Sequence, residues 1–69
     1  MRIEELLKEL RKIRKMKGVS LRKMAKALEV SAQLVSMIER GKVPLKVDEY
    51  CKMCAVLGVS PSELLRDYE

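Results

Sequence analysis

Apolar residues recur every three or four positions along most of the chain, which is the spacing of one face of a helix. The first such stretch covers residues 3–17 and stops at Gly18, a residue typical of the position just beyond a helix. No stretch alternates with a period of two, so we expect no strands. The pattern therefore predicts an all-α fold class, a compact domain of five short helices spanning residues 1–69. The four later helices are expected at residues 21–28, 32–40 and 47–57, and from Pro61 onward.

The predicted core consists of the apolar residues on the inner face of each helix. Burying them together is the main source of stability for a chain of only 69 residues, which is close to the lower size limit for independent folding. The residues expected inside are Ile3, Leu6, Leu7, Leu10, Ile13, Met16, Met24, Ala25, Leu28, Val35, Ile38, Val47, Tyr50, Cys51, Cys54 and Leu57.

The dipeptide Val-Ser precedes three of the predicted helices, at residues 19–20, 30–31 and 59–60. Each serine is a candidate N-cap, because its side-chain oxygen can accept hydrogen bonds from the first turn of a helix. Each valine stands five residues before an apolar residue, which is the spacing of a hydrophobic staple, and Glu63 is placed to complete a capping box with Ser60. The first two starts lie eleven residues apart, the spacing of a helix-turn-helix whose second helix can enter the major groove of DNA.

Positive charge is concentrated in the first part of the chain. The net charge is +5, but residues 1–42 carry 12 basic and 5 acidic side chains, whereas residues 43–69 carry 3 and 5. Between Arg11 and Lys26 there are eight basic residues and no acidic one. A segregated excess of this kind favours a polyanionic partner over an evenly solvated surface.

Several other classes of protein are disfavoured by the composition. No apolar run reaches the roughly 18–20 residues needed to span a bilayer, and no signal peptide is visible, so we expect a cytoplasmic, nucleoid-associated protein. Two cysteines and no histidine are too few to hold zinc within one chain, and no nucleophile has a histidine base, so we expect no metal, cofactor or enzyme activity. Cys51 and Cys54 form a C-x-x-C pair, but core packing is favoured over a redox or metal role.

The segment 20–41, SLRKMAKALEVSAQLVSMIERG, resembles the helix-turn-helix of the lambda-repressor/Cro (Xre) family. Small Ala25 stands where the two helices of that motif cross closely, and Leu28 and Val30 bracket the turn. The resemblance extends over nearly the whole chain and implies a five-helix domain that binds DNA. Its further landmarks are Ile13-Arg14, Glu39-Arg40-Gly41 and Leu57-Gly58-Val59-Ser60.

The resemblance also implies a structural ion pair and shows two departures. In the family, an arginine of the first helix pairs with the glutamate that ends the recognition helix, which here implies a pair between Arg14 and Glu39. The turn position usually held by glycine is Glu29, which therefore has to adopt the left-handed region. The first position of the second helix, often glutamine, is Leu21, which cannot donate a hydrogen bond to a phosphate.

The family pattern places the recognition helix at about residues 32–40 and its base contacts on one side. Gln33 has the chemistry for bidentate reading of adenine, and Ser36 can donate to a base or a phosphate. Apolar Leu34 and Met37 can touch thymine methyl groups, or alternatively belong to the core or to a protein contact. The candidate base contacts are Ala32, Gln33, Ser36 and Met37, with Leu34 beside them.

Cations at both ends of the motif are the candidate phosphate contacts. Arg22 and Lys23 begin the second helix, where acidic residues normally complement the helix dipole, although harmless surface cations would look the same. Arg40 and Lys42 follow the recognition helix, and Lys46 is a weaker candidate.

We therefore expect a sequence-specific transcriptional regulator, most simply a repressor, that binds a double-stranded DNA operator as a homodimer without a small-molecule ligand. One such domain makes few base contacts, and a second half-site multiplies its specificity. Candidate dimer residues are Leu65 and Tyr68. The alternative is a protein-interaction module, antitoxin-like or an anti-regulator, that keeps the fold without reading DNA.

Overall fold

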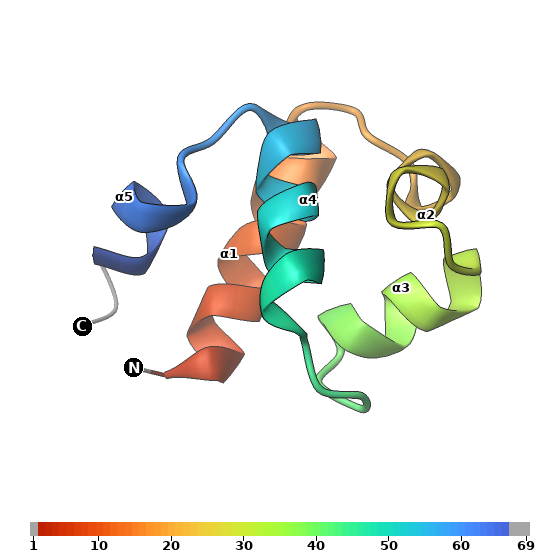
Figure 1. Cartoon of the computed structure of the whole chain (residues 1–69), viewed down its shortest axis with the longest axis horizontal. Coiled ribbons are helices and arrows are strands. Elements are labelled where there is room, and N and C mark those ends of the chain that lie inside the picture. The colour runs from red at the N-terminus through yellow and green to blue at the C-terminus, as the bar shows by residue number, and fades with distance from the viewer. Residues whose placement is uncertain (1, 67–69) are drawn as a thin grey trace.

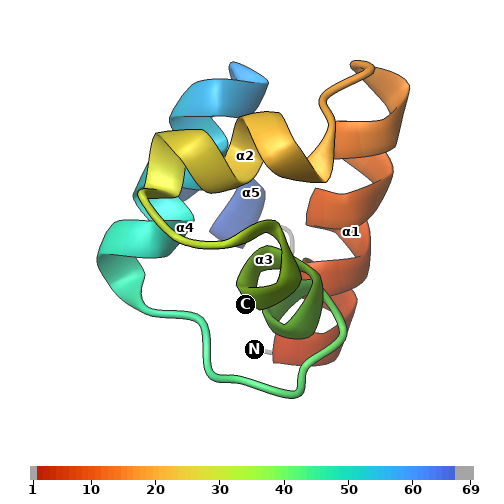
Figure 2. The ribbon, with the colours of Figure 1, turned by 90° about the vertical axis from the view of Figure 1, so that its right-hand side faces the viewer.

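The computed structural model describes residues 2–66 and contains five helices. No strand occurs in that range, so the predicted all-α class is confirmed. Figure 1 shows α2 and α3 at one side of the molecule and α5 at the other, with α1 and α4 between them. Seen from the α2–α3 side, α2 runs across the top of the molecule between α1 and α4 (Figure 2). The helices are α1 (Ile3–Met16), α2 (Leu21–Leu28), α3 (Ala32–Glu39), α4 (Val47–Leu57) and α5 (Pro61–Arg66).

The predicted serine caps start α2 and α3. The Ser20 hydroxyl accepts a hydrogen bond from the Lys23 backbone N–H at 3.0 Å, and the Ser31 hydroxyl accepts one from the Leu34 N–H at 3.0 Å. Each bond satisfies one of the backbone donors that a helix start leaves free. These two caps fix where α2 and α3 begin and therefore fix the spacing of the motif.

The third Val-Ser start is less complete. The Ser60 hydroxyl accepts from the Glu63 N–H at 3.4 Å, which is the first half of the predicted capping box. The reciprocal bond is absent there among the described residues, and it occurs instead at α4, where the Glu49 carboxylate accepts from the Lys46 N–H at 2.9 Å. α5 is held mainly by burial of Leu64 and by the Tyr50 hydroxyl, which donates to the Pro61 carbonyl at 2.7 Å.

All five helices contribute to one apolar core. α2 packs against both α3 and α4, while α3 also packs against α1 and α5 packs against α4. Close packing of this kind leaves each helix with only one orientation that buries its apolar face. The central cluster consists of Leu6, Leu10, Val19, Met24, Ala25, Leu28, Val35, Tyr50, Met53, Cys54, Leu57 and Leu64.

The prediction of the inner face of α4 was wrong along one edge of that face. Val47 is 79% exposed and Cys51 is exposed, whereas Met53, which was not predicted, is 1% exposed. Tyr50, Cys54 and Leu57 fit either of two overlapping arcs of the helix, because a residue advances by about 100°. The arc that contains Met53 buries a larger apolar side chain than the arc that contains Cys51, and the fold uses it.

The ends of the predicted stripe on α1 were also wrong. Ile3 is 47% exposed and Met16 is 76% exposed, because they are the first and last residues of a helix longer than the body it packs on. The buried part of the stripe is confined to the middle turns, at Leu6, Leu7 and Leu10. Ile13 is half-buried against the core.

Candidate nucleic-acid interface

The turn between α2 and α3 closes through a residue in the left-handed region. Glu29 has φ 58° and ψ 41°, the conformation expected from its place where the family has glycine. The Val30 N–H donates to the Ala25 carbonyl at 3.0 Å and the Glu29 N–H donates to the Lys26 carbonyl at 3.3 Å. These bonds satisfy the last carbonyls of α2, so the turn keeps its geometry although its central residue has a Cβ.

α2 and α3 pack against each other, and the family pattern places the small residue Ala25 where they cross. Ala25 is 4% exposed and lies in the same cluster as Leu28 and Val35. A larger side chain at residue 25 would push α3 away from α2, since this contact leaves little free volume. The crossing therefore determines how far α3 protrudes from the rest of the domain.

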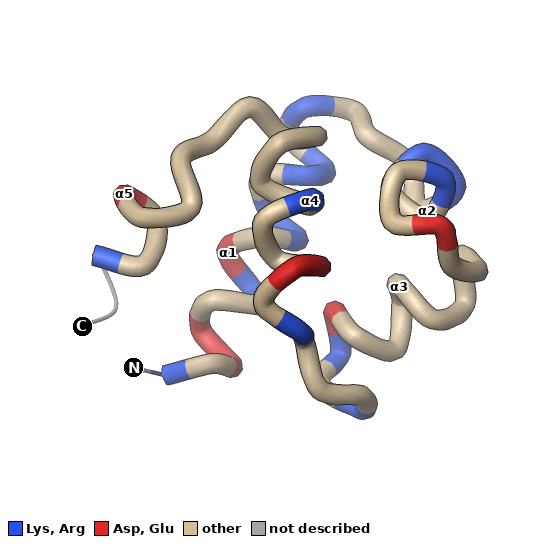
Figure 3. The backbone as a smooth tube through the Cα atoms, in the orientation of Figure 1, with Lys and Arg blue, Asp and Glu red and all other residues tan. Residues whose placement is uncertain are grey.

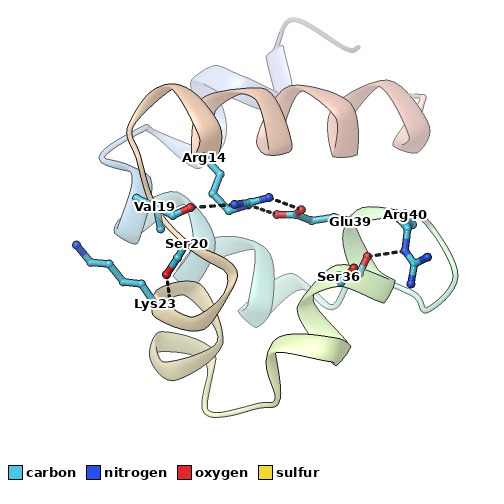
Figure 4. Close-up of polar contacts among 7 residues, drawn as sticks. All are labelled: Arg14, Val19, Ser20, Lys23, Ser36, Glu39 and Arg40. Atoms are coloured by element: carbon cyan, nitrogen blue, oxygen red, sulfur yellow. Dashed lines mark hydrogen bonds and ion pairs between the residues drawn. The ribbon is translucent and has the colours of Figure 1, made fainter.

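A buried ion pair ties α3 to α1. The Arg14 guanidinium donates two hydrogen bonds to the Glu39 carboxylate, Nε to Oε2 at 2.7 Å and Nη2 to Oε1 at 3.1 Å. A third bond runs from Arg14 Nη1 to the Val19 carbonyl at 2.9 Å. Figure 4 shows the guanidinium reaching from α1 to both partners. Both charged residues are 7% exposed, so this pair belongs to the interior and not to the DNA-facing surface.

The candidate base contacts differ in how far they are available to a ligand. Gln33 is exposed, and Ser36 and Met37 are half-buried. Leu34 is half-buried as well, and it lies outside the side chains that pack on the central core of residues 2–66. Ala32, in contrast, packs against that core. Gln33 is therefore the polar group of α3 that solvent, or a base edge, reaches most freely.

The candidate phosphate contacts lie at the two ends of the motif, and all four are exposed. Arg22 and Lys23 stand in the first turn of α2, which has no acidic residue. Arg40 is the C-cap of α3, and its Nε donates to the Ser36 carbonyl at 3.4 Å, while Lys42 follows in the next turn. Figure 3 shows cations on α2 and in the turn after α3.

Two further cations adjoin the second of these ends, and the sequence did not single them out as contacts. Lys8 and Arg11 of α1 line a hollow of about 610 Å³ together with Arg40 and Lys42. Their spacing of three residues, on the same face of a helix, was the available signal. The hollow joins α1 to the exit of α3, and its four cations outnumber the two acidic residues in its lining, Glu4 and the ion-paired Glu39.

The two cysteines of the C-x-x-C pair differ in burial. Cys54 is fully buried, one turn after the buried Tyr50. Burial raises the pKa of both groups, so both stay protonated near neutral pH. Cys51, three residues before Cys54, is exposed at the edge of the buried face, and no three metal-binding side chains come together within residues 2–66.

Of the two candidate dimer residues, only Leu65 lies within the described range. It is half-buried and packs against the core at the end of α5. Tyr68 lies outside the described residues. In the described part of the chain, no helix is long and apolar enough to cross a membrane.

Comparison with known proteins agrees with this arrangement. A family model described as Helix-turn-helix matches residues 10–64, and the chain belongs to this family, the lambda-repressor-like (Xre) class. Among solved structures, the chain is similar to the clp gene regulator ClgR from Corynebacterium glutamicum, with 37% identity and a TM-score of 0.82. The match covers 90% of this chain but 66% of the ClgR chain. No curated protein matches.

Proposed function

We propose that this protein is a sequence-specific transcriptional regulator, acting as a repressor, that binds a DNA operator as a homodimer in the cytoplasm. Family membership and the likeness to a gene regulator support the DNA-binding class. The single observation that carries the proposal is the exposed side of α3, with Gln33 at its start and cations at both ends of the motif. A repressor can act simply by occupying its operator, and the exposed side of α3 with the flanking cations supports such binding.

In this proposal α3 lies in the major groove and Gln33 reads an adenine through its N6 and N7 atoms. Met37 and Ala32 line the groove as apolar contacts, and Ser36 donates to a base or a phosphate. The first-turn N–H groups of α2 that Ser20 leaves free add to the positive field of Arg22 and Lys23. On the other side of the groove, Arg40 and Lys42 hold the second strand.

Dimerisation is proposed through the surface around α5. One protomer offers Gln33 and Ser36 as its polar base-reading groups, which limits the sequence information that a single half-site provides. Two protomers whose recognition helices lie one DNA turn apart double that information. Leu65, at the end of α5, and Tyr68 are the proposed contacts.

The salt dependence of binding tests this function. Four phosphate contacts per protomer make eight per dimer, so affinity for a duplex is expected to fall about 10³- to 10⁵-fold between 50 and 200 mM salt. Binding is measured by fluorescence anisotropy on a labelled duplex from a random pool enriched by the protein itself. If the protein binds no duplex in a salt-sensitive way, the proposal is contradicted.

The second candidate is a protein-interaction module, and one observation favours it. Leu34 and Met37 are half-exposed apolar side chains on the outer side of α3, and methionine adapts to varied protein partners. A module of this class binds no duplex in a salt-sensitive way and loses its partner when Met37→Lys is introduced. The anisotropy experiment therefore separates the two candidates.

A further inference from the structure

One face of α1 carries a row of four cations that the proposed interface does not use. Lys8, Arg11, Lys12 and Lys15 follow one another at intervals of three, one and three residues, which places all of them on the same side of the helix. All four are exposed, and together with Met16 they line one shallow hollow. We refer to Lys8, Arg11, Lys12 and Lys15 as the α1 belt. Figure 3 shows cations recurring along α1.

Within residues 2–66, no ion pair joins an acidic side chain to the α1 belt. Glu4, Glu5 and Glu9 share the helix, but the ion pair formed there joins Glu5 to Arg2, at 3.3 Å. The described belt residues form no ion pair. Like charges four residues apart repel each other on a helix surface, as Lys8 and Lys12 do. A polyanion bound along the belt would relieve this repulsion.

The α1 belt is continuous with the proposed phosphate contacts. Lys8 and Arg11 belong both to the belt and to the hollow that Arg40 and Lys42 line at the exit of α3. Two acidic residues also border that hollow: Glu39 is neutralised by Arg14, and Glu4 sets one negative charge against the four cations. A DNA strand that leaves the recognition helix over Arg40 and Lys42 meets this row of cations next.

We propose that the α1 belt binds the DNA backbone outside the half-site that α3 reads, so that each protomer holds flanking DNA along α1. This inference rests on the proposed function. From Lys8 to Lys15 the helix rises about 10 Å, which matches roughly three phosphates of one strand along the DNA axis. An acidic protein fits less well, because the belt has no aromatic side chain of the kind that anchors protein interfaces.

Flank length and salt dependence together test the belt. The belt variant is Lys12→Ala with Lys15→Ala, and the control is Lys52→Ala with Arg66→Ala, which removes the same charge from exposed residues of α4 and α5. Both are compared with the wild type on a long duplex, with ten base pairs on each side of the selected site, and on a short one with two. Circular dichroism confirms that the variants keep their helical content.

On the long duplex, the belt variant is expected to reduce the slope of log affinity against log salt by about 0.9 for each lost phosphate contact, or 1.8 per protomer. The control is expected to keep the wild-type slope on both duplexes, and the belt variant is expected to match the wild type on the short one. Equal slopes for belt variant and control on the long duplex would overturn the inference while the proposed function stands. Failure of the wild type to bind either duplex would overturn both.

Discussion

At the scale of single residues, Arg14 does most to fix the position of the recognition helix. Its guanidinium holds the last residue of α3 through two bonds to Glu39 and the end of the α1–α2 turn through one bond to Val19. A planar group with a fixed fork of donors sets geometry as well as attraction. The pair lies in the interior, so its energetic value depends on both partners being present.

Removing one partner of this pair is expected to destabilise the domain strongly. Glu39→Ala leaves the Arg14 charge buried without a counter-charge. Arg14→Ala likewise leaves the Glu39 carboxylate buried without a counter-charge. Each is expected to lower the free energy of unfolding by about 3–5 kcal/mol, measured by urea denaturation. The double variant Arg14→Ala with Glu39→Ala is expected to lose much less than the sum of the two. Additive losses would show that the two residues do not act as a pair.

Alkaline pH is expected to weaken the fold through Tyr50 and Cys54. Burial raises the pKa of both groups in the folded state, so this contribution to stability is complete below their unfolded pKa values, about 8.5 for cysteine and 10 for tyrosine. As the pH rises further, the unfolded chain ionises first and unfolding becomes easier. Thermal midpoints between pH 8 and 11 are expected to fall for the wild type.

The variant Tyr50→Phe removes one of these titrations together with the hydrogen bond to the Pro61 carbonyl. Its midpoint is expected to start lower at pH 8 and to fall less steeply toward pH 11. Cys51→Ser, at an exposed position of the same helix, is expected to keep the wild-type profile. A Tyr50→Phe profile parallel to the wild type would contradict this account of the buried hydroxyl.

At the scale of helices, the turn between α2 and α3 is the strained connection. Glu29 adopts φ 58°, which costs a residue with a Cβ roughly 1–2 kcal/mol relative to the right-handed region. Glycine adopts this conformation without the steric penalty, although its unfolded state has more entropy. Glu29→Gly is therefore expected to raise the free energy of unfolding by about 0.5–1 kcal/mol in urea denaturation.

Gly18 provides the matched control for this change. It has φ 68°, and a Cβ built there meets nothing within 4 Å, so backbone conformation is what an alanine would change. Gly18→Ala is expected to lower the free energy of unfolding by roughly 1 kcal/mol, opposite in sign to Glu29→Gly. Two changes of the same sign would show that the left-handed conformation is not the determining factor.

The sequence predicted helix starts better than helix faces. Ser20 and Ser31 marked the starts of α2 and α3 because capping is a local interaction between a side chain and the next turn. The inner face of α4 depends instead on what the other helices place against it. Cys51 and Met53 are both compatible with the apolar pattern of that helix, and the core volume decides between them.

In the candidate site, too, local features could be predicted from the sequence, whereas contacts between helices could not. The exposed position of Gln33 follows from helical periodicity within α3. The proximity of Lys8 and Arg11 to Arg40 depends on how α1 packs on α3, and local pattern carries no information on that packing. Long-range neighbours of this kind become visible only in the folded structure.

At the scale of the whole molecule, charge and shape divide the domain into two sides. Cations dominate α1, α2 and the turn after α3, whereas residues 43–69 carry a small negative excess. A positive field on one side orients the domain toward DNA before any base is read and speeds encounter. The proposed function assigns the reading of the sequence to the few hydrogen-bonding groups on α3, with shape and deformability of the DNA supplying further specificity.

The claim that α3 reads DNA through Gln33 is tested most directly by comparing the sequences that the wild type and two variants select from a random pool of duplexes. The wild type is expected to enrich a motif with an adenine in each of two half-sites, about one DNA turn apart. Gln33→Ala is expected to lose preference at that adenine and about 1–3 kcal/mol of affinity for the original motif. Arg40→Ala is expected to enrich the same motif while binding every duplex more weakly. An unchanged motif with Gln33→Ala would contradict the account.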